Sequence, residues 1–170
     1  MSVYKHRGLY FEEFEIGQRF YSAGRTITEN DIVSFAGLSG DYNQIHTDAQ
    51  FAEKTPYEQR IAHGLLVTSV ASGLIAQSGL IEGTVLAFRE ISNWKFARPT
   101  FIGDTVHVEV EVKDTKALRR LGGGAVEILV SVNNQNNEIL EIVKVEGQRS
   151  ITTSKFLFRA SPGRIDLKPF

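Results

Sequence analysis

The sequence holds an aspartate and a histidine five positions apart, Asp41 and His46, in the segment GDYNQIH. A carboxylate beside an imidazole can take a proton from water and return one to carbon, because histidine titrates near neutral pH. At this spacing the two side chains would not share a face of a continuous helix or strand. They converge only if the chain turns, which Gly40 and Asn43 permit. The alternative is a polar turn in which Asp41 binds only local backbone amides.

The segment RIAHGLLVTS places Gly64 at the expected start of a helix that runs to about residue 77. Backbone N–H groups in the first turn lack partners inside the helix and lie at the positive end of its dipole. They can therefore polarise a carbonyl group and stabilise an enolate, as an oxyanion hole does. His63 directly precedes this glycine. The sequence leaves open whether it points into a site or binds backbone at the helix start.

No fully charged residue occurs between Arg60 and Glu82. This stretch is long enough to cross a bilayer, but it contains a histidine, a threonine, a glutamine and several serines and glycines. Such polar residues favour a helix buried inside a soluble domain. An uncharged helix must be covered on most sides, and a curved sheet wrapped around it is the simplest arrangement.

Most of the remaining chain has the pattern of β-strands. In DTVHVEVEV four valines alternate with polar residues, which predicts a half-buried strand. AVEILVSV and EILEIVKVEGQRSI flank the polar turn NNQNN and predict a hairpin. The aromatic residues Phe88, Trp94 and Phe96 are predicted to lie in the core. The predicted fold class is α+β, with an antiparallel sheet around one long helix.

A shorter helix is expected before the turn that holds Asp41. Thr28 and Asp31 have the spacing of a capping pair at a helix start. Apolar residues then recur on one face, beginning with Ile32, and glycines that end at Gly40 close the helix. A further short helix is expected at about residues 48–54.

Length and composition limit the class of protein. A chain of 170 residues with 42% hydrophobic and 23% charged residues is ordinary for one soluble domain. The net charge of −1 gives no general attraction to nucleic acid or to anionic membranes. Because the sequence has no cysteine, disulfides, thiolate metal sites and a cysteine nucleophile are excluded. The N-terminal segment lacks the apolar stretch of a signal peptide, so we expect a cytoplasmic protein.

A metal site is not expected from the histidines. The motif HTD at residues 46–48, with His107 later in the chain, superficially matches the ligands of a non-haem iron site. His107, however, falls on the polar face of an alternating strand, where a solvent-facing role is the simpler interpretation. We therefore predict no metal ion and no cofactor.

The run GLSGDYNQIHTDAQFA closely resembles the signature of MaoC-like dehydratases and (R)-specific enoyl-CoA hydratases. The segments AHGLL and FARPTFIGDTVHVEVEV are similar to later segments of that family, in the same order. The resemblance covers about residues 10–150. Gln44 departs from the pattern, because the family usually has proline there, but the change removes no functional group.

The resemblance implies a single hot-dog domain, with its core at about residues 10–150 and a C-terminal extension at 151–170. In this fold the sheet wraps around the central helix predicted at 64–77. The resemblance also implies a homodimer or a larger homo-oligomer, with the CoA site near the subunit boundary.

The resemblance further implies a reaction: reversible addition of water to a trans-2-enoyl-CoA, giving the (R)-3-hydroxyacyl-CoA. By position, Asp41 and His46 would bind the reacting water, and the Gly64 amide would polarise the thioester carbonyl. Asn43 would shape the loop between them. We expect Asp41 to act as the base on water and His46 to deliver the proton to Cα.

Candidate substrate-binding residues include basic side chains, because CoA carries phosphates. We take Arg89, Arg119 and Arg120 as such candidates, together with Asn43 and His63. Glycines follow two of these arginines and could let their loop close over a ligand. The carrier is either CoA or acyl carrier protein, and the acyl group is left open.

Two other functions fit the same fold. A hot-dog acyl-CoA thioesterase would release free thiol, but such enzymes generally lack the loop that carries Asp41 and His46. A non-catalytic acyl-CoA binding module would be expected to lose one of these two residues, and both are present. The hydratase is therefore the favoured prediction.

Overall fold

The computed structural model describes residues 7–92, 94–118, 120, 122–142 and 154–161. Their helices and strands follow one another in this order: η1 (Phe11–Glu13), β1 (Arg19–Tyr21), β2 (Arg25–Thr26), α1 (Glu29–Ser39), α2 (Gln44–Thr47), α3 (Ala49–Ala52), α4 (Gly64–Gln77), β3 (Val85–Ile91), β4 (Lys95–Phe96), β5 (Thr105–Leu118), β6 (Gly123–Asn133), β7 (Ile139–Ile142) and β8 (Ser154–Arg159). This content confirms the α+β fold class.

The strands form one antiparallel sheet whose centre is the long pair β5 and β6. β1 and β2 both pair with β5. On its other edge β6 pairs with β7 at one end and with β8 at the other. β7 then pairs with β4, and β8 with β3. The predicted hairpin around NNQNN is the β6–β7 pair, and it is confirmed.

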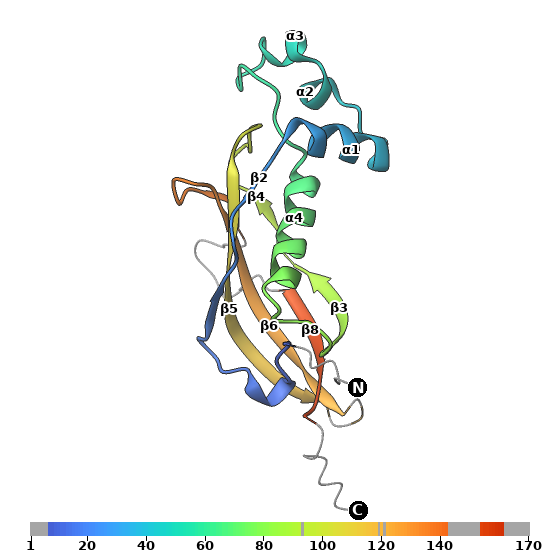
Figure 1. The fold of residues 1–170 in the computed structure, drawn as a ribbon, viewed down its shortest axis with the longest axis vertical. Coiled ribbons are helices and arrows are strands. Elements are labelled where there is room, and N and C mark those ends of the chain that lie inside the picture. The colour runs from blue at the N-terminus through green and yellow to red at the C-terminus, as the bar shows by residue number, and fades with distance from the viewer. Residues whose placement is uncertain (1–6, 93, 119, 121, 143–153, 162–170) are drawn as a thin grey trace, which may run out of the picture.

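Helix α4 lies along the concave side of this sheet (Figure 1), and its bounds match the predicted residues 64–77. The buried residues of the helix are Leu66, Val67, Val70, Ala71, Leu74 and Ile75. They share one core with the valines that alternate along β5 and β6. The curved sheet therefore covers the uncharged helix, as expected.

Helices α1, α2 and α3 form a cap over the N-terminal end of α4 (Figure 1). The side chain of Thr28 accepts a hydrogen bond from the Asp31 amide, and Asp31 caps the Thr28 amide in return. Ile32 is fully buried, which anchors α1 to the core. Gly40 ends α1 in the left-handed conformation, at φ +78°, where glycine is favoured. The predicted helix at residues 48–54 is shorter, and α2 before it was not predicted.

The sheet continues beyond the core boundary that the sequence analysis places near residue 150. Strand β8, which belongs to the predicted C-terminal extension, lies between β6 and β3. Phe156 and Phe158 of this strand are buried, because the strand covers the end of the core next to α4. Residues 162–170 of the extension lie outside the described residues.

Two of the three aromatic residues predicted for the core are largely exposed in this chain. Phe88 is 48% exposed and Phe96 is 55% exposed. Phe88 lies on β3, whose second edge has no partner strand among the described residues, and Phe96 lies at the opening of a cleft. Trp94 is partly buried against the core, as predicted.

The longest helices of the described part of the chain are too short or too polar to cross a membrane.

We expect the buried side chain of Ile32 to hold α1 against the core. Replacing Ile32 by alanine should lower the free energy of unfolding by roughly 2–5 kcal/mol, because it leaves a cavity in the core. Val33, its exposed neighbour at 56%, is the matched control, and Val33→Ala should change stability by only about 0.5 kcal/mol. Urea unfolding at one protein concentration measures both. Equal losses in the two variants would contradict this packing.

Candidate active site

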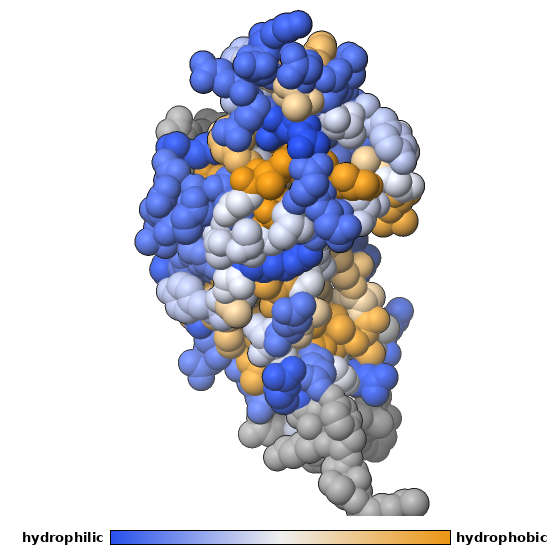
Figure 2. Space-filling model, turned by 45° about the horizontal axis from the view of Figure 1, so that its top comes forward, coloured by the Kyte–Doolittle hydropathy of each residue, from blue (hydrophilic) through white to orange (hydrophobic). Residues whose placement is uncertain are grey.

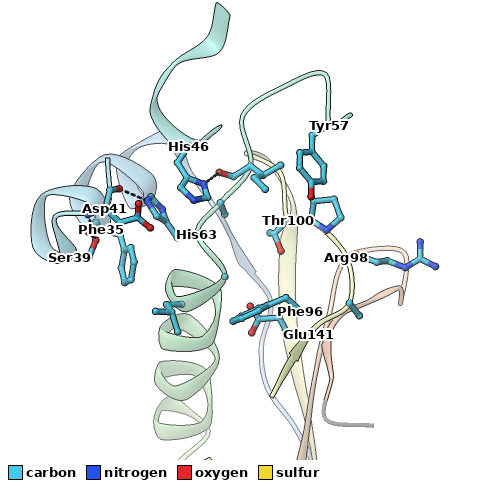
Figure 3. Close-up of a pocket in the computed structure, with 16 residues that line it drawn as sticks. Phe35, Ser39, Asp41, His46, Tyr57, His63, Phe96, Arg98, Thr100 and Glu141 are labelled. Carbon is cyan, nitrogen blue, oxygen red and sulfur yellow. Dashed lines mark hydrogen bonds between the residues drawn. The ribbon is translucent and has the colours of Figure 1, made fainter. Parts of the chain in front are cut away.

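A cleft of about 530 Å³ opens at the N-terminal end of α4 (Figure 3). Side chains from the α1–α2 turn, α2, the start of α4 and strands β4 and β7 line it. The lining residues include Asp41, His46, His63, Gly64, Phe96, Arg98 and Glu141. The cleft thus brings the predicted pair Asp41 and His46 together with Gly64, which lies later in the chain.

The turn between α1 and α2 makes Asp41 and His46 converge. Gly40 reverses the chain after α1, and Asn43 caps α2 by accepting a hydrogen bond from the Ile45 amide. His46 is then presented on the single turn of α2. Gln44 is the first residue of that turn, a position that tolerates proline because its N–H has no partner inside the helix. The proline that the family usually has would thus also fit at this position.

The cluster at the cleft contains a third group, His63. One carboxylate oxygen of Asp41 and one ring nitrogen each of His46 and His63 all lie within 4.8 Å of one another. The two imidazole rings are 3.8 Å apart at their centroids. His63 is 2% exposed, whereas Asp41 is exposed. The cluster thus runs from the surface into the interior.

The hydrogen bond of His46 fixes which of its nitrogens is free. Nδ1 lies 2.8 Å from the Ile61 carbonyl oxygen and donates to it, because a carbonyl can only accept. Nε2 of the neutral ring therefore carries a lone pair. Burial lowers the pKa of His46 below its usual value, an effect larger than the opposing hydrogen bond to Ile61, and nearby His63 lowers it further. At neutral pH the ring is thus a proton acceptor.

His63 lines the cleft and also binds backbone, but not at the helix start. It precedes the first turn of α4, and its Nε2 donates to the Asp41 carbonyl oxygen at 2.9 Å. This bond joins the start of α4 to the turn that carries Asp41. Its Nδ1 is buried and has no hydrogen-bond partner among the described residues. A buried unpaired acceptor is costly, and it marks a place where a donor such as water would bind.

Asp41 also makes the local contact that the alternative interpretation proposed. Its Oδ1 accepts a hydrogen bond from the Asn43 amide at 3.2 Å. A carboxylate can accept several hydrogen bonds, and this contact uses only one of them. Asp41 can therefore hold the turn and still bind a donor in the cleft.

Gly64 begins α4 directly beneath Phe96. A Cβ atom at position 64 would lie 2.5 Å from Cε1 of the Phe96 ring, so no side chain fits without moving the ring. Within the described part of the chain, the first three amides of α4 donate no hydrogen bond, and Val67 is the first that does. Two of these amides, those of Gly64 and Leu65, belong to residues that line the cleft. They form a site for an oxygen that carries partial negative charge.

The same cluster has the composition of a metal site. Two imidazoles and one carboxylate at this separation can hold a divalent cation. This set differs from the HTD and His107 pattern considered in the sequence, because Asp48 caps α3 and His107 lies in the middle of the sheet on β5. The absence of a metal ion stays a prediction.

Two of the predicted basic residues, Arg89 and Arg120, are not among the residues that line the cleft. Arg89 lies on the edge strand β3, and Arg120 lies in the β5–β6 hairpin at the far end of the sheet from α1. Arg119 is outside the described residues. Arg98 does line the cleft, and its guanidinium is paired with Glu138 at 3.0 Å. Roles for Arg89, Arg119 and Arg120 in binding stay predictions.

Glu141 is a buried carboxyl group that the sequence analysis missed. It lies on β7, lines the cleft and is 2% exposed. Its Oε2 contacts Thr68 Oγ1 at 3.1 Å and Trp94 Nε1 at 3.2 Å. Burial raises the pKa of Glu141 to about 8, although both hydrogen bonds oppose the shift. The group is therefore mostly protonated at neutral pH.

The raised pKa of Glu141 makes stability depend on pH. The unfolded chain ionises this group near 4.5 and the folded chain near 8. The stability that the protonated group contributes is complete below pH 4.5 and is lost as pH rises toward 8. Across this window the wild type should lose about 1.4 kcal/mol per pH unit relative to Glu141→Gln, which stays neutral. Urea unfolding of both proteins at pH 5 and pH 8 measures this difference. If the unfolding free energies of the wild type and Glu141→Gln differ by the same amount at pH 5 and pH 8, Glu141 does not carry a proton in the folded protein at neutral pH.

Comparison with known proteins identifies relatives of this chain. The family model described as "MaoC like domain" matches residues 12–134. A 3-hydroxybutyryl-CoA dehydratase from Methylorubrum extorquens is 37% identical over 114 residues, which are 67% of this chain and 70% of that protein. An (R)-specific enoyl-CoA hydratase from Aeromonas caviae is 37% identical over 59% of this chain and 72% of its own length. Protein MaoC of Klebsiella aerogenes is 38% identical, but the chain spans only 30% of its length.

Solved structures share the architecture as well. An unliganded R-hydratase from Pseudomonas aeruginosa superimposes with a TM-score of 0.71 at 28% identity, over 91% of this chain and 88% of that one. A protein from Mycobacterium tuberculosis described as having a double hot-dog fold gives a TM-score of 0.73 at 20% identity, over 96% of this chain and 47% of that one. The sheet around α4 is therefore a hot-dog fold. With the matched residues 12–134, these similarities show that the chain belongs to the MaoC-like dehydratase family.

Proposed function

We propose that this protein catalyses reversible hydration of a trans-2-enoyl-CoA to the (R)-3-hydroxyacyl-CoA. One observation carries the proposal: a cluster of proton acceptors, namely Asp41, His46 and His63, lies in the same cleft as the free amides at the start of α4. Addition of water to a conjugated thioester needs both parts. A base must take a proton from water, and a donor must stabilise the negative charge on the thioester oxygen. The relatives named as hydratases and dehydratases support the same class of reaction.

The acceptors would hold water in the cleft by its two hydrogens. The Asp41 carboxylate and the Nε2 lone pair of His46 are the two acceptors that would receive them. As the water oxygen bonds to Cβ, one proton leaves it and the other stays in the new hydroxyl group. Because His46 is neutral, it has no proton of its own to give at Nε2. The proton that reaches Cα is therefore the one that left water, relayed through Asp41 or His46.

The start of α4 would stabilise the enolate. The Gly64 amide, with the Leu65 amide beside it, would donate to the thioester oxygen as negative charge develops there. The missing side chain at Gly64 lets Phe96 lie against the helix and leaves the amides open to the cleft. Because the dipole of α4 is positive at this end, it adds to the stabilisation.

The thioester carrier would approach the open side of the cleft. Arg98 lines the cleft and is more than half exposed, so it is placed to meet a phosphate group. Arg89 could contribute only from a second subunit, since it lies on β3 rather than at the cleft of its own chain. CoA and acyl carrier protein both carry a phosphate near the thioester arm and fit this placement.

We also propose a homodimer formed through β3. This strand pairs with β8 on one edge only, and the apolar side chains of Leu86, Phe88 and Ile91 are exposed along it. An exposed apolar edge strand favours pairing with another strand. Figure 2 shows that apolar surface does reach the outside of the molecule between the polar helical cap and the opposite end.

Substitution of the two acceptors should abolish hydration. Asp41→Asn removes the base and His46→Gln removes the imidazole, and each should lower kcat/KM by on the order of 10² or more. The measurement is the loss of conjugated-thioester absorbance with crotonyl-CoA. His107→Gln on β5, outside the cleft, is the matched control for the histidine. Full activity in both cleft variants would overturn the roles of Asp41 and His46.

The same assay separates the competing functions. Free thiol released by the wild type would indicate a thioesterase, and binding of acyl-CoA without turnover would indicate a binding module. Dialysis against EDTA tests the metal-like cluster, and activity should be unchanged. Loss of activity that added Zn²⁺ or Fe²⁺ restores would contradict the metal-free reaction.

The oligomeric state tests the role of β3. Light scattering should give twice the 19.0 kDa of one chain. Leu86→Glu should produce monomer, because it places a charge on the apolar edge. Leu38→Glu is the control, since Leu38 is 84% exposed on α1. A dimer that survives Leu86→Glu would show that the subunits meet elsewhere.

A further inference from the structure

Glu141 lies at the inner end of the cleft, between the catalytic cluster and the body of the domain. It lines the cleft beside Phe96 (Figure 3). The two residues that contact its Oε2, Thr68 and Trp94, line a separate apolar cavity deeper along α4. That cavity is only about 40 Å³, close to the roughly 30 Å³ that one water occupies in the liquid. An acyl chain that enters past Gly64 therefore meets a polar group before it meets apolar space.

The hydrogen bonds around Glu141 leave one of its oxygens available. Both bonds that the described residues make to the carboxyl group end on Oε2. The side chain borders the cleft, and neither of these bonds uses Oε1. A carboxyl oxygen beside a cleft tends to take a hydrogen-bond partner when one is present. A ligand in the cleft would provide it.

The proton on Glu141 decides what kind of ligand group fits. The Thr68 hydroxyl has one proton and two acceptors at 3.1 Å, the Gly64 carbonyl oxygen and Glu141 Oε2. If Thr68 donates to Gly64, Glu141 donates to Thr68 from Oε2, and Oε1 is an acceptor. If Thr68 donates to Glu141, the proton is on Oε1, which is then a donor. A hydroxyl group satisfies both arrangements, because it donates and accepts. A carboxylate group on the ligand can only accept hydrogen bonds, so it would fit only the second arrangement. It would also bring a charge into the interior of the protein.

The distance between Gly64 and Glu141 limits the length of the acyl chain. Thr68 Oγ1 lies 3.1 Å from both the Gly64 carbonyl oxygen and Glu141 Oε2, so these two oxygens are no more than about 6 Å apart. An extended chain advances roughly 1.2 Å per bond, as the extended protein backbone does with three bonds per residue. The polar group is therefore about five bonds from the thioester carbonyl carbon. This distance corresponds to a hydroxyl on the fifth carbon of the acyl chain.

We propose that Glu141 is a specificity-determining residue that selects short enoyl thioesters with a hydroxyl group at the far end of the acyl chain. The inference rests on the proposed hydratase function and goes beyond it by naming the substrate class. Thr68 and Trp94 hold the carboxyl group in place, and the small cavity behind them excludes longer apolar chains.

The test compares two substrates that differ only at the terminal group. In 5-hydroxypent-2-enoyl-CoA a hydroxyl stands where hex-2-enoyl-CoA has a methyl group. The wild type should favour the hydroxylated thioester at least tenfold in kcat/KM, because the methyl group would leave Glu141 unpaired. Glu141→Gln should keep this preference, since an amide also donates and accepts. Glu141→Leu should reverse it, whereas Glu109→Leu, on β5 outside the cleft, should keep the wild-type ratio.

The outcomes separate this inference from the proposed function. Equal kcat/KM for the two thioesters in the wild type, with turnover of crotonyl-CoA intact, would overturn the role of Glu141 alone. A uniform loss on both substrates in Glu141→Leu, with the ratio unchanged, would show that Glu141 is only structural. No turnover of any of the three thioesters would overturn the hydratase function and this inference with it.

Discussion

The uncharged helix α4 is stable in this chain only because the sheet removes its apolar surface from water. Six of its side chains are buried, and a flat sheet would cover only one side of the helix. The long strands β5 and β6 curve along it, and β8 and β3 continue the cover on the other flank. The burial of apolar area drives this arrangement. As a consequence, the first turn of α4 emerges where the sheet ends.

The candidate site follows from that exposed helix start. The sheet supplies no partners for the first amides of α4, so they remain open to the cleft. The α1–α3 cap closes over them, and the bond from His63 to the Asp41 carbonyl fixes the turn that carries Asp41 against the helix. The same bond leaves the other nitrogen of His63 buried and unpaired. Groups that are poorly satisfied in the free protein are thereby gathered at one place, which is typical of functional sites.

Glu141 extends this pattern into the interior. A buried carboxyl group lowers stability unless it is protonated and hydrogen-bonded. Thr68 and Trp94 meet part of that requirement at Oε2. The chain would be more stable at neutral pH with an apolar residue there, as buried ionisable groups often prove to be dispensable for stability. Its position in the wall of the cleft is consistent with a role in ligand binding, as proposed above.

The sequence alone determined those features whose physical causes are local. The bounds of α4, the capping pair Thr28 and Asp31, and the alternation along β5 could all be predicted, because each depends on residues within one or two turns or strands. For the segment between Asp41 and His46, the sequence left two interpretations open: a turn that brings the two side chains together, and a polar turn that binds only local backbone. Sequence showed that convergence required a turn, whereas the chain path through Gly40 and Asn43 showed that it occurs.

Only the tertiary structure decided which residues lie inside. Glu141 directly follows Leu140, and a charged residue usually faces solvent, yet both residues are buried. Phe96 is exposed, and β8 joins the sheet from beyond the predicted core. Of the basic residues expected at the site, Arg89 and Arg120 do not line the cleft, whereas Arg98 does. These outcomes depend on which strands pair and where the sheet ends against α4. Such contacts join residues distant in sequence, so no local pattern encodes them.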